Sequence, residues 1–550
     1  MALTQSNNSH EVVVIGGGPG GSTAATMLAR QGIRVLLLER ERFPRDHVGE
    51  SLLPASMPVL EELGVLPAVQ QAGFLPKWGA TMIWGKDKRP WSRYFKETNQ
   101  RHPHSYQVWR PQFDQLLLDN SRSHGVDVRE GHRVLEVVFE HGRSCGVRFM
   151  DDNGNEKTAH ADFIVDASGQ GGLLGRQLGL RRWDTFFQNL AVYGYFTGGG
   201  RLPGTDENNI FIESYPQGWL WNIPLHTGWA SIRAVVDSRA GQEGIQACGP
   251  KDFLARQIGQ TTYTAQMLKS AQLVSGPFIV KDWSYMCEQM VGDGYIMVGD
   301  AACFIDPLFS SGVHLALMSG VMAAAYVTSA LQDSGLGEAA RPVYQELYRK
   351  EYRHFRELAR LFYSSNRTAE SYFWEARRIL ESDESLTPRH AFIQAVAGQP
   401  PRGYERAVLE HGELPPAFAE SVRQIEFKRS RRNVQFEAAV AQPLASPENL
   451  HNLIPCLAAD GRLERKPILA SGEFQWGYVL TTPGRPEGIE CSELVAVLLS
   501  RIDGRATIGE LMARLQEGCN EAQRAQVQRS VLNAIQVLYV DGAISKLRGR

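Results

Sequence analysis

The feature that most constrains the fold of this chain is a glycine-rich turn close to its N-terminus. The turn, residues 16–21, reads GGGPGG and follows a short apolar segment, residues 11–15. An Ala-rich segment of helical composition comes next, and a second apolar segment then ends at Glu39. The order strand, tight turn, helix and strand is typical of a parallel sheet that is covered by helices. We therefore expect an α/β fold that begins with a Rossmann-type unit.

The spacing of the glycines in this turn is that of a dinucleotide-binding motif. Gly16 permits the tight turn, Gly18 lets the backbone approach a pyrophosphate, and Gly21 allows the helix to pack closely on the strand. The N-terminus of the following helix offers free N–H groups to the phosphates. Glu39 stands at the end of the second strand, where a carboxylate accepts hydrogen bonds from a ribose diol. These four residues therefore predict a site for FAD or NAD.

Two later segments favour FAD over NAD. Residues 166–169 and residues 299–302 each follow a short apolar segment and each contain an aspartate and a glycine. The carboxylate of Asp300 is placed to bind the ribityl chain of a flavin. A helix that starts at Gly312 would point its N-terminus at the flavin ring, where its dipole stabilises the negative charge of the reduced form. We therefore expect FAD as the cofactor, with Asp300 and Gly312 in its site.

Composition limits the classes of function. The chain has 58 Lys and Arg against 60 Asp and Glu, so no basic excess favours nucleic acid. Its 7 cysteines form no CxxC pair, which is typical of reduced thiols in a cytoplasmic protein without a metal site. The first ten residues lack the basic and apolar regions of a signal peptide. Residues 307–332 carry no charged side chain, but their many Gly, Ala and Ser residues predict a buried helix rather than a membrane span.

A length of 550 residues suggests three or four domain-sized units of about 150 residues. We expect an FAD-binding domain in two interleaved pieces, an antiparallel substrate-side sheet, a helical substrate-covering region, a linker and a small C-terminal α+β module. The respective ranges are 1–190 with 281–335, 191–280, 336–440, 441–476 and 477–550. In the last range, residues 503–511 resemble part of a winged-helix module that binds peptides.

Four segments resemble the FADH2-dependent halogenases, which belong to the flavoprotein monooxygenase-like superfamily. They are FPRDHVGES at residues 43–51, PKWGA at residues 76–80, GWLWNIP at residues 218–224 and DPLFSSG at residues 306–312. The resemblance covers about residues 10–440 and is most specific in GWLWNIP together with the lysine. It implies a two-component enzyme that receives FADH2 from a separate flavin reductase.

The resemblance also implies how the chemistry is divided. Reduced flavin, O2 and chloride give hypochlorous acid, which reaches Lys77 and is directed from there to the substrate. An isolated lysine is more often a surface charge, but the neighbours of Lys77 in the sequence include Phe74 and Trp78. Burial among such residues would lower the pKa of the amine and favour a reactive form. Lys77 is therefore the expected catalytic residue.

The loop at residues 306–312 is expected to hold the halide. Backbone N–H groups of Ser311 and Gly312, at the start of a helix, can form a nest for a bare anion. Capping of the helix by Ser310 or Ser311 is an alternative role that does not exclude the first. Asp306 opens the loop, and its carboxylate could also lie at the flavin edge and form an ester with it.

Trp219 and Trp221 stand two residues apart, so their side chains share one face of a strand. We expect them, with Pro224, to line a passage that separates the substrate from the flavin, and core packing is the alternative role. Three further residues complete the expected flavin site: Arg45, Ser51 and Arg110.

One position departs from the pattern of the tryptophan halogenases. Phe309 stands three residues before Gly312, where those enzymes carry a catalytic glutamate. The lack of this carboxylate favours a self-activated ring, such as a phenol or a pyrrole, over an indole. The substrate could be a free small molecule or be tethered to a carrier protein, and the basic residues 428–432 could contact the acidic surface of such a carrier.

Two other functions are compatible with the sequence alone. The chain could be an aromatic hydroxylase that reduces its own FAD with NAD(P)H, or a non-catalytic flavin-binding partner protein. A chlorinated product would distinguish the halogenase from both alternatives.

Overall fold

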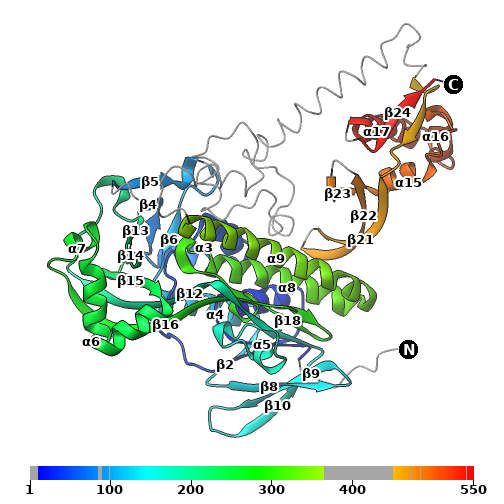
Figure 1. Ribbon diagram of the computed structural model, residues 1–550. Coiled ribbons are helices and arrows are strands. Elements are labelled where there is room, and N and C mark those ends of the chain that lie inside the picture. The colour runs from blue at the N-terminus through cyan, green and yellow to red at the C-terminus, as the bar shows by residue number, and fades with distance from the viewer. Residues whose placement is uncertain are drawn as a thin grey trace. The chain divides into compact units, whose positions relative to one another are not determined.

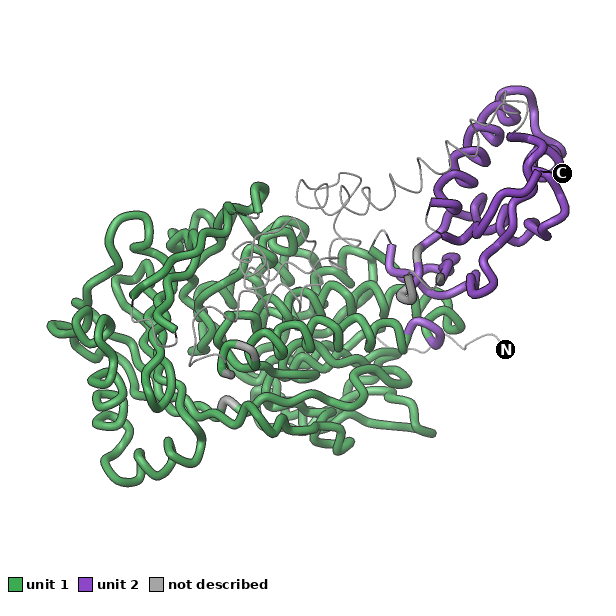
Figure 2. Tube along the Cα trace, turned by 45° about the horizontal axis from the view of Figure 1, so that its top comes forward, with its two compact units in different colours: residues 1–337, 341–413, 471–473 green, residues 338–340, 414–470, 474–550 purple. Residues whose placement is uncertain are grey.

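The computed structural model of this chain describes residues 10–84, 89–97, 99–364, 450–470, 472–482, 485–540 and 542–549. The chain divides into two compact units, which Figure 2 shows in different colours. The first unit comprises residues 1–337, 341–413 and 471–473, and the second comprises residues 338–340, 414–470 and 474–550.

The first unit contains a six-stranded sheet whose central strands carry the glycine-rich turn. β1 (Val12–Ile15) is buried along its whole length and pairs in parallel with β2 (Val35–Glu39) and β11 (Phe163–Asp166). The strand order is β17-β18-β11-β1-β2-β7, in which the edge pair β17 and β18 is antiparallel and the other four pairs are parallel. The other strands are β7 (Asp127–Glu130), β17 (Val291–Gly292) and β18 (Tyr295–Met297). The start of the chain therefore folds as its pattern predicts.

Helix α1 (Pro19–Arg30) begins directly after the turn and packs against α8 (Gly312–Gln332). The two helices approach closely where Gly320 faces Gly20: a Cβ on Gly320 would lie 2.7 Å from the backbone oxygen of Gly20. By length and composition α8 could cross a membrane, but 83% of its apolar window is buried inside the protein. The uncharged segment is therefore a core helix, as its many small residues predict.

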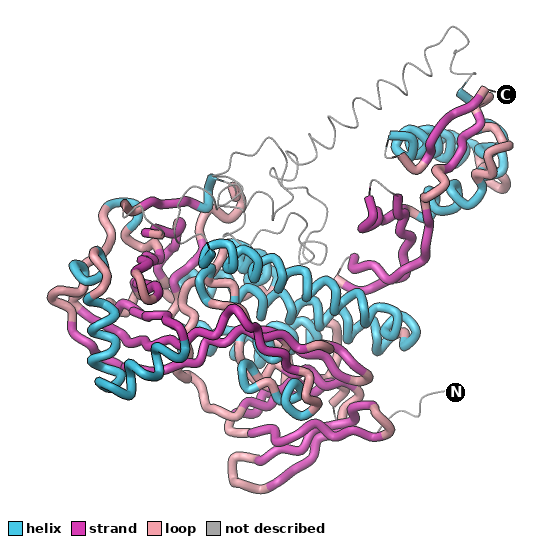
Figure 3. The backbone as a smooth tube through the Cα atoms, viewed as in Figure 1, coloured by secondary structure: helices cyan, strands magenta, loops and turns pink. Residues whose placement is uncertain are grey.

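A second sheet of eight strands has the order β19-β16-β12-β15-β14-β13-β4-β5 (Figure 1). β4 pairs in parallel with β13, and the other neighbours are antiparallel. The long paired strands β12 and β16 run across the unit (Figure 3). The bounds are β4 (Gly79–Ile83), β5 (Trp91–Tyr94), β12 (Arg181–Thr197), β13 (Ile210–Tyr215), β14 (Gly218–Pro224), β15 (Trp229–Asp237), β16 (Gln272–Cys287) and β19 (Cys303–Phe304).

Side chains along these strands alternate between two faces of the sheet. We call the face that carries Trp219 and Trp221 the cavity face, and the opposite face, which carries Leu220, the outer face. Helices α6 (Ser238–Gly259), which is kinked at Gly249, and α7 (Tyr263–Met267) cover the outer face. There Leu220 packs in a buried apolar cluster with Phe253 of α6.

The two sheets are interleaved along the chain, but not with the expected ranges. β4 and β5 belong to the eight-stranded sheet, although residues 1–190 were all expected in the FAD-binding part. The expected antiparallel sheet at residues 191–280 is also longer and mixed, because β4 adds in parallel to β13. A pairing between segments so distant in sequence leaves no local pattern from which it could be predicted.

The remaining described elements of the first unit are smaller, apart from one long helix. β3 pairs with β6, and a separate three-stranded sheet has the order β10-β9-β8. The strands are β3 (Leu75–Lys77), β6 (Ser105–Gln107), β8 (Arg133–Glu140), β9 (Arg143–Met150) and β10 (Glu156–His160). The helices are α2 (Met57–Glu62), α3 (Leu66–Gln71), α4 (Arg110–Ser123), α5 (Leu173–Gln177) and α9 (Ser334–Ser364).

The long helix α9 forms the beginning of the helical region expected at residues 336–440. Tyr344 and Tyr348 of this helix are buried, and their hydroxyls donate to the backbone oxygens of Met297 and Gly299 at 3.0 and 3.1 Å. The rest of the expected helical region, with the basic residues 428–432, lies outside the described residues.

The second unit contains two small sheets and three helices in its described part. β20 (Ile454–Leu457) pairs with β24 (Ile544–Arg548), and a three-stranded sheet consists of β21 (Arg462–Ala470), β22 (Glu473–Thr482) and β23 (Arg485–Cys491). The helices are α15 (Glu493–Arg501), α16 (Ile508–Leu515) and α17 (Glu521–Val540). The range expected as a linker, residues 441–476, thus contains strands, and β20 finds its partner only at the far end of the unit.

His314 of α8 is fully buried and lies close to His354 of α9, which is half-buried. The ring of His314 lies 6.1 Å from that of Phe355, and neither of its nitrogens has a hydrogen-bond partner within the described part of the chain. Burial lowers the pKa of both His314 and His354 to about 4. The unfolded chain therefore binds more protons than the folded chain between the ordinary pKa of 6.5 and about pH 4.

We expect stability to be lost as the pH falls from 6.5 to 4, by up to about 3 kcal/mol through the fully buried His314. The variant His314→Leu should melt at a higher temperature than the wild type at neutral pH, because it leaves no unsatisfied nitrogens. It should also lose part of the acid sensitivity. Calorimetric melting of both proteins at neutral and mildly acidic pH tests this, and an identical pH dependence would contradict it.

Candidate active site

A cavity of about 660 Å³ is lined by residues from both sheets of the first unit. The glycine-rich turn, residues 45–51 and residues 167–171 line it on the side of the six-stranded sheet. Trp221 and Arg233 line it from the cavity face of the eight-stranded sheet. The volume is in the range of cofactor sites.

The glycine-rich turn leaves its backbone open to this cavity. Gly16 has φ +101°, and a Cβ on it would lie 2.4 Å from the backbone oxygen of Ala167, so only glycine fits. Gly18 also lines the cavity, and a Cβ there would lie 3.3 Å from the guanidinium of Arg45. Gly21 has the packing role that its position predicts, because a Cβ on it would lie 1.9 Å from the backbone oxygen of Gly16.

Glu39, at the end of β2, is hydrogen-bonded to the backbone of this turn and lines the cavity. Its carboxylate accepts hydrogen bonds from the backbone N–H of Gly17 at 2.7 Å and of Glu41 at 2.8 Å. Each carboxylate oxygen can accept more than one bond, so both retain capacity for a ribose hydroxyl. Glu39 therefore lies where the sequence places it.

Residues 45–51 form a further wall of the cavity. Ser51 is 4% exposed and lines the cavity, and its hydroxyl has no hydrogen-bond partner among the described residues. A buried hydroxyl of this kind is expected where a ligand supplies the missing partner. Arg45 and Asp300 line the same cavity, so the structure brings these predicted cofactor residues together.

Arg110, at the start of α4, is buried and fixes this wall. It donates two bonds of 2.8 Å to the carboxylate of Asp114 and one of 2.7 Å to the backbone oxygen of Val48. Burial tends to lower the pKa of Arg110, but the neighbouring Asp114 carboxylate raises it above its usual value. Arg110 thus lines the cavity and also forms a buried salt bridge with Asp114.

The loop before α8 presents Ser310 and Gly312 to the cavity. Ser310 has φ 57°, and a Cβ on Gly312 would meet nothing within 4 Å, so space is open at the helix start. Ser311 occupies the N-cap position without a side-chain cap bond and is 2% exposed. The hydroxyl of Ser311 therefore does not cap α8, and Ser310 is the serine that borders the cavity.

Asp306 lies outside the lining of the cavity in the described structure. Its buried carboxylate accepts hydrogen bonds from Asn189 Nδ2 and from the hydroxyl of Tyr363, both at 2.7 Å. It also accepts a bond of 3.1 Å from the backbone N–H of Leu308. These contacts engage Asp306 with the protein rather than with the flavin cavity.

Lys77, the last residue of β3, is 2% exposed. Its Nζ donates a hydrogen bond of 2.9 Å to the backbone oxygen of Leu52 and lies 5.3 Å from the ring centroid of Phe95. Burial lowers the pKa of Lys77 to about 7. Lys77 itself does not line the cavity, but Leu52 directly follows Ser51, which does.

The aromatic residues of β14 follow the predicted alternation. The ring centroids of Trp219 and Trp221 lie 5.9 Å apart on the cavity face. Trp221 lines the cavity, whereas the indole of Trp219 donates to the hydroxyl of Tyr363 at 2.6 Å.

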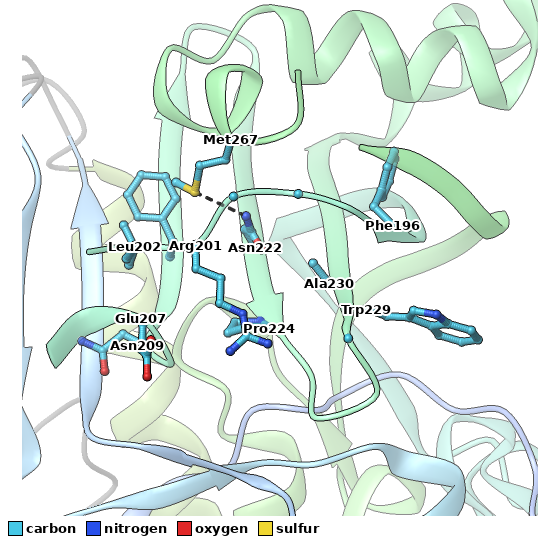
Figure 4. Close-up of a pocket in the computed structure, with 14 residues that line it drawn as sticks. Phe196, Arg201, Leu202, Glu207, Asn209, Asn222, Pro224, Trp229, Ala230 and Met267 are labelled. Carbon is cyan, nitrogen blue, oxygen red and sulfur yellow. Dashed lines mark hydrogen bonds between the residues drawn. The ribbon is translucent and has the colours of Figure 1, made fainter. Parts of the chain in front are cut away.

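Pro224 differs from the expectation that it lines the same passage. It lies at a separate small pocket on the outer face with Asn222 and Met267 (Figure 4). The reason is the alternation of the strand: Pro224 is three residues from Trp221, so its ring points to the opposite face.

Glu50 is a cavity residue that the sequence analysis did not assign. It is fully buried, lines the cavity and accepts a hydrogen bond of 2.9 Å from the hydroxyl of Tyr195. A single acidic residue between Val48 and Leu52 is the sequence signal that could have identified it. Arg233 and Tyr193 were also missed, because strand residues of this kind carry no motif.

The residues present fit FAD. The open turn at the start of α1 with Arg45 beside it suits a pyrophosphate, Glu39 suits a ribose, and the unpartnered hydroxyl of Ser51 suits a further polar group of the cofactor. The fold and the cavity together define an FAD-dependent oxidoreductase, and the family described as FAD dependent oxidoreductase matches residues 11–177.

A second family, described as tryptophan halogenase, matches residues 96–421, which is more than half of the chain. The chain belongs to this family of flavin-dependent halogenases. It is therefore an enzyme of the oxidoreductase type that uses FAD and a halide, which favours the halogenase over the hydroxylase and the non-catalytic alternatives.

Individual relatives agree with this assignment. The tryptophan 2-halogenase of Chondromyces crocatus is 34% identical over 380 residues, which are 68% of this chain and 72% of that protein. The 1H-pyrrole-2-carbonyl peptidyl-carrier-protein chlorinase of Pseudomonas fluorescens is 31% identical over 387 residues, which are 66% of this chain and 85% of that protein. Among solved structures, the myxobacterial chondrochloren halogenase CndH shares 38% identity at a TM-score of 0.63 over 71% of this chain and 96% of its own. The flavin-dependent halogenase CmlS shares 28% identity at a TM-score of 0.68 over 99% of this chain and 96% of its own.

The variant Glu39→Ala should bind FAD about tenfold more weakly or worse, because it removes a buried acceptor of the glycine-rich turn and of a ribose. Glu39→Gln retains one acceptor oxygen and should lose less of the affinity for FAD. Titration of the apoprotein with FAD, followed by flavin fluorescence, measures both. Glu136→Ala, which removes an exposed carboxylate of β8, is the control and should bind like the wild type. Wild-type affinity of Glu39→Ala would contradict the assignment.

Proposed function

We propose that this halogenase chlorinates an electron-rich aromatic ring of the phenol or pyrrole type in natural-product biosynthesis, and that hypochlorous acid reaches the substrate by way of Lys77. Bound reduced flavin supplies, together with O2, the two-electron oxidation that converts chloride to hypochlorous acid. In this proposal the six-stranded sheet binds the cofactor, and the cavity face of the eight-stranded sheet lines the path of hypochlorous acid to the substrate.

The observation that carries the proposal is the burial of the Lys77 amine, which donates to the backbone oxygen of Leu52, the residue next to Ser51 of the cavity wall. A pKa of about 7 means that protonated and neutral amine are both populated near neutral pH. The protonated form can donate a hydrogen bond to hypochlorous acid. The neutral form can make an N–Cl bond with release of water. In either case the chlorine passes without its bonding electrons to a ring carbon, and the ring loses a proton.

We place the halide at the start of α8. The backbone N–H groups of Ser311 and Gly312 lie at the positive end of a helix of 21 residues, and Gly312 leaves the adjacent space open. On the cavity face, the indole Nε1 of Trp221 is a buried donor without a partner among the described residues. It can offer a hydrogen bond to an anion or to hypochlorous acid in the cavity.

The proposed substrate class follows from the loop residue Phe309. This residue is 6% exposed and packs against Phe362 with ring centroids 4.8 Å apart, so no carboxylate is available there to take a ring proton. A phenol or a pyrrole carries an acidic proton of its own and needs less help. The relatives named above include enzymes named for tryptophan and for a carrier-bound pyrrole, so a carrier-tethered substrate is part of the proposal.

The proposal includes partners. A separate flavin reductase supplies FADH2, as flavin-dependent halogenases in general require, and we place the reaction in the cytoplasm.

We propose that the second unit is a winged-helix-like module that contacts a protein partner. In support, its segment 503–511 contains a capping box in which Thr507 and Glu510 start α16.

The variant Lys77→Ala should lower chlorination by about a hundredfold or more while flavin oxidation continues at the wild-type rate, because oxidant is formed but not delivered. The assay supplies FAD, NADH, a reductase, chloride, and a panel of phenols and pyrroles with and without a carrier protein. Mass spectrometry identifies the product by its chlorine isotope doublet.

Two matched variants control this experiment. Lys77→Arg keeps a charged hydrogen-bond donor but offers no neutral amine, so loss of its chlorination indicates the N–Cl route and retained chlorination indicates the hydrogen-bond route. Lys96→Ala, which removes an exposed ammonium over Tyr94, should remain active. Wild-type chlorination by Lys77→Ala would exclude the lysine from the reaction, and an oxygenated product without chlorine would exclude halogenation.

The variant Gly312→Ala should raise the KM for chloride by about tenfold, or about 1.4 kcal/mol, with a smaller change in kcat. The added methyl group meets no protein atom within 4 Å, so the fold is retained, but it enters the space at the start of α8. Gly259→Ala, whose Cβ also meets nothing, is the control on the outer-face helix. Equal chloride dependence of both variants and the wild type would place the halide elsewhere.

A further inference from the structure

Tyr363, at the C-terminal end of α9, joins three parts of the first unit that are distant in sequence. Its hydroxyl donates a hydrogen bond to Asp306 Oδ2 at 2.7 Å. The same oxygen accepts from Trp219 Nε1 at 2.6 Å and from Asn189 Nδ2 at 3.0 Å. We call these four residues the tyrosine bridge. A phenolic hydroxyl has one donor and two acceptor positions, and all three are used here.

Three of the four residues of the bridge are buried, Tyr363 is half-buried, and Asp306 supplies a carboxylate. Asp306 is 1% exposed, Trp219 is 2% exposed and Asn189 is 8% exposed. A hydrogen bond to a carboxylate is stronger than one between neutral groups, and low local polarity strengthens it further. The geometry of Trp219 relative to Asp306 is therefore set by the hydroxyl of Tyr363.

Each end of the bridge lies in a part of the proposed reaction path. Asp306 also accepts from the backbone N–H of Leu308, so it shapes the loop that leads to Ser310 and Gly312. Trp219 lies next to Trp221, which lines the cavity. The bridge thus connects the loop of the proposed halide site with the aromatic wall of the eight-stranded sheet.

The residue before Tyr363 strengthens the same connection. The backbone oxygen of Phe362 accepts a hydrogen bond of 2.8 Å from Trp84 Nε1. The ring of Phe362 contacts the ring of Phe309. The ring of Tyr363 itself packs edge-on against Phe187 at 5.3 Å. The end of α9 is therefore held both to the sheet and to the loop.

We propose that Tyr363 is a positioning residue that locks the aromatic wall at Trp219 to the halide loop and so retains hypochlorous acid until it reaches Lys77. This inference rests on the proposed function. Tyr363 exchanges no atom with the oxidant in this role, because its single proton stays in the bond to Asp306.

The test uses the FAD-loaded full chain with the variant Tyr363→Phe, which keeps the ring and removes only the hydroxyl. External taurine captures escaping hypochlorous acid as its N-chloro derivative with release of water, so no organic substrate is needed. We expect the amount of N-chlorotaurine formed per flavin oxidised (the captured fraction) to rise about tenfold. This factor corresponds to the free energy lost when one partner of a buried hydrogen bond is removed. The rate of flavin oxidation and the affinity for FAD should not change. Asp306→Asn should change the captured fraction in the same direction.

Tyr215→Phe is the matched control. The hydroxyl of Tyr215 donates a hydrogen bond of 3.0 Å to Gln257 on the outer face, so this variant also loses a buried tyrosine hydroxyl, but away from the bridge. Its captured fraction should equal that of the wild type. Equal capture by Tyr363→Phe and the wild type would overturn the inference. So would a joint loss of FAD affinity and melting temperature in Tyr363→Phe, since that marks a merely structural role.

Failure of the proposed function would look different. In that case the wild type and Lys77→Ala would both oxidise flavin without giving any oxidised chlorine, either in product or in taurine. This result would remove the positioning role together with the reaction that it serves.

Discussion

The absence of side chains at a few glycines is the constraint on which the active region depends. At Gly16 the backbone of the first turn contacts Ala167, and at Gly21 the first helix contacts Gly16. The same helix meets α8 through Gly20 and Gly320. Since α8 begins at the loop of the proposed halide site, these close contacts relate the position of the cofactor phosphates to that of the halide. A methyl group on any of these glycines would push apart the segments that hold the cofactor site and the proposed halide site.

Much of the fold follows from local sequence patterns. The first strand, turn, helix and strand are recognised because their signals are adjacent in the chain and because Glu39 completes them. The parallel pairing of β4 with β13 and the pairing of β20 with β24 could not be derived in this way. In both cases the partner is distant in sequence, so the apolar pattern of each strand shows that it pairs but not with which strand. The expected domain ranges differ from the structure for that reason.

The candidate site shows the same division. The buried Lys77, the two indoles of β14, and the residues of the glycine-rich turn were accessible from spacing, apolar neighbours or resemblance. Glu50 was not assigned, because its place in the cavity depends on Tyr195 from another strand. Tyr363 has no motif at all, and its importance appears only when Trp219 and Asp306 are brought to it. Sequence patterns thus identify residues that belong to a local motif better than residues whose role depends on contacts with distant segments of the chain.

The alternation of side chains along β14 has a consequence for how such an enzyme can change over time. Trp221 and Ile223 line the cavity, while Leu220, on the opposite face, packs with α6. Substitutions at the first set alter what the cavity accommodates and leave the apolar packing against α6 intact. Neighbouring positions of one short strand can therefore change independently, one set affecting the cavity and the other the packing of the fold. A lineage can diversify its substrates at alternate positions without first acquiring compensating mutations in the scaffold.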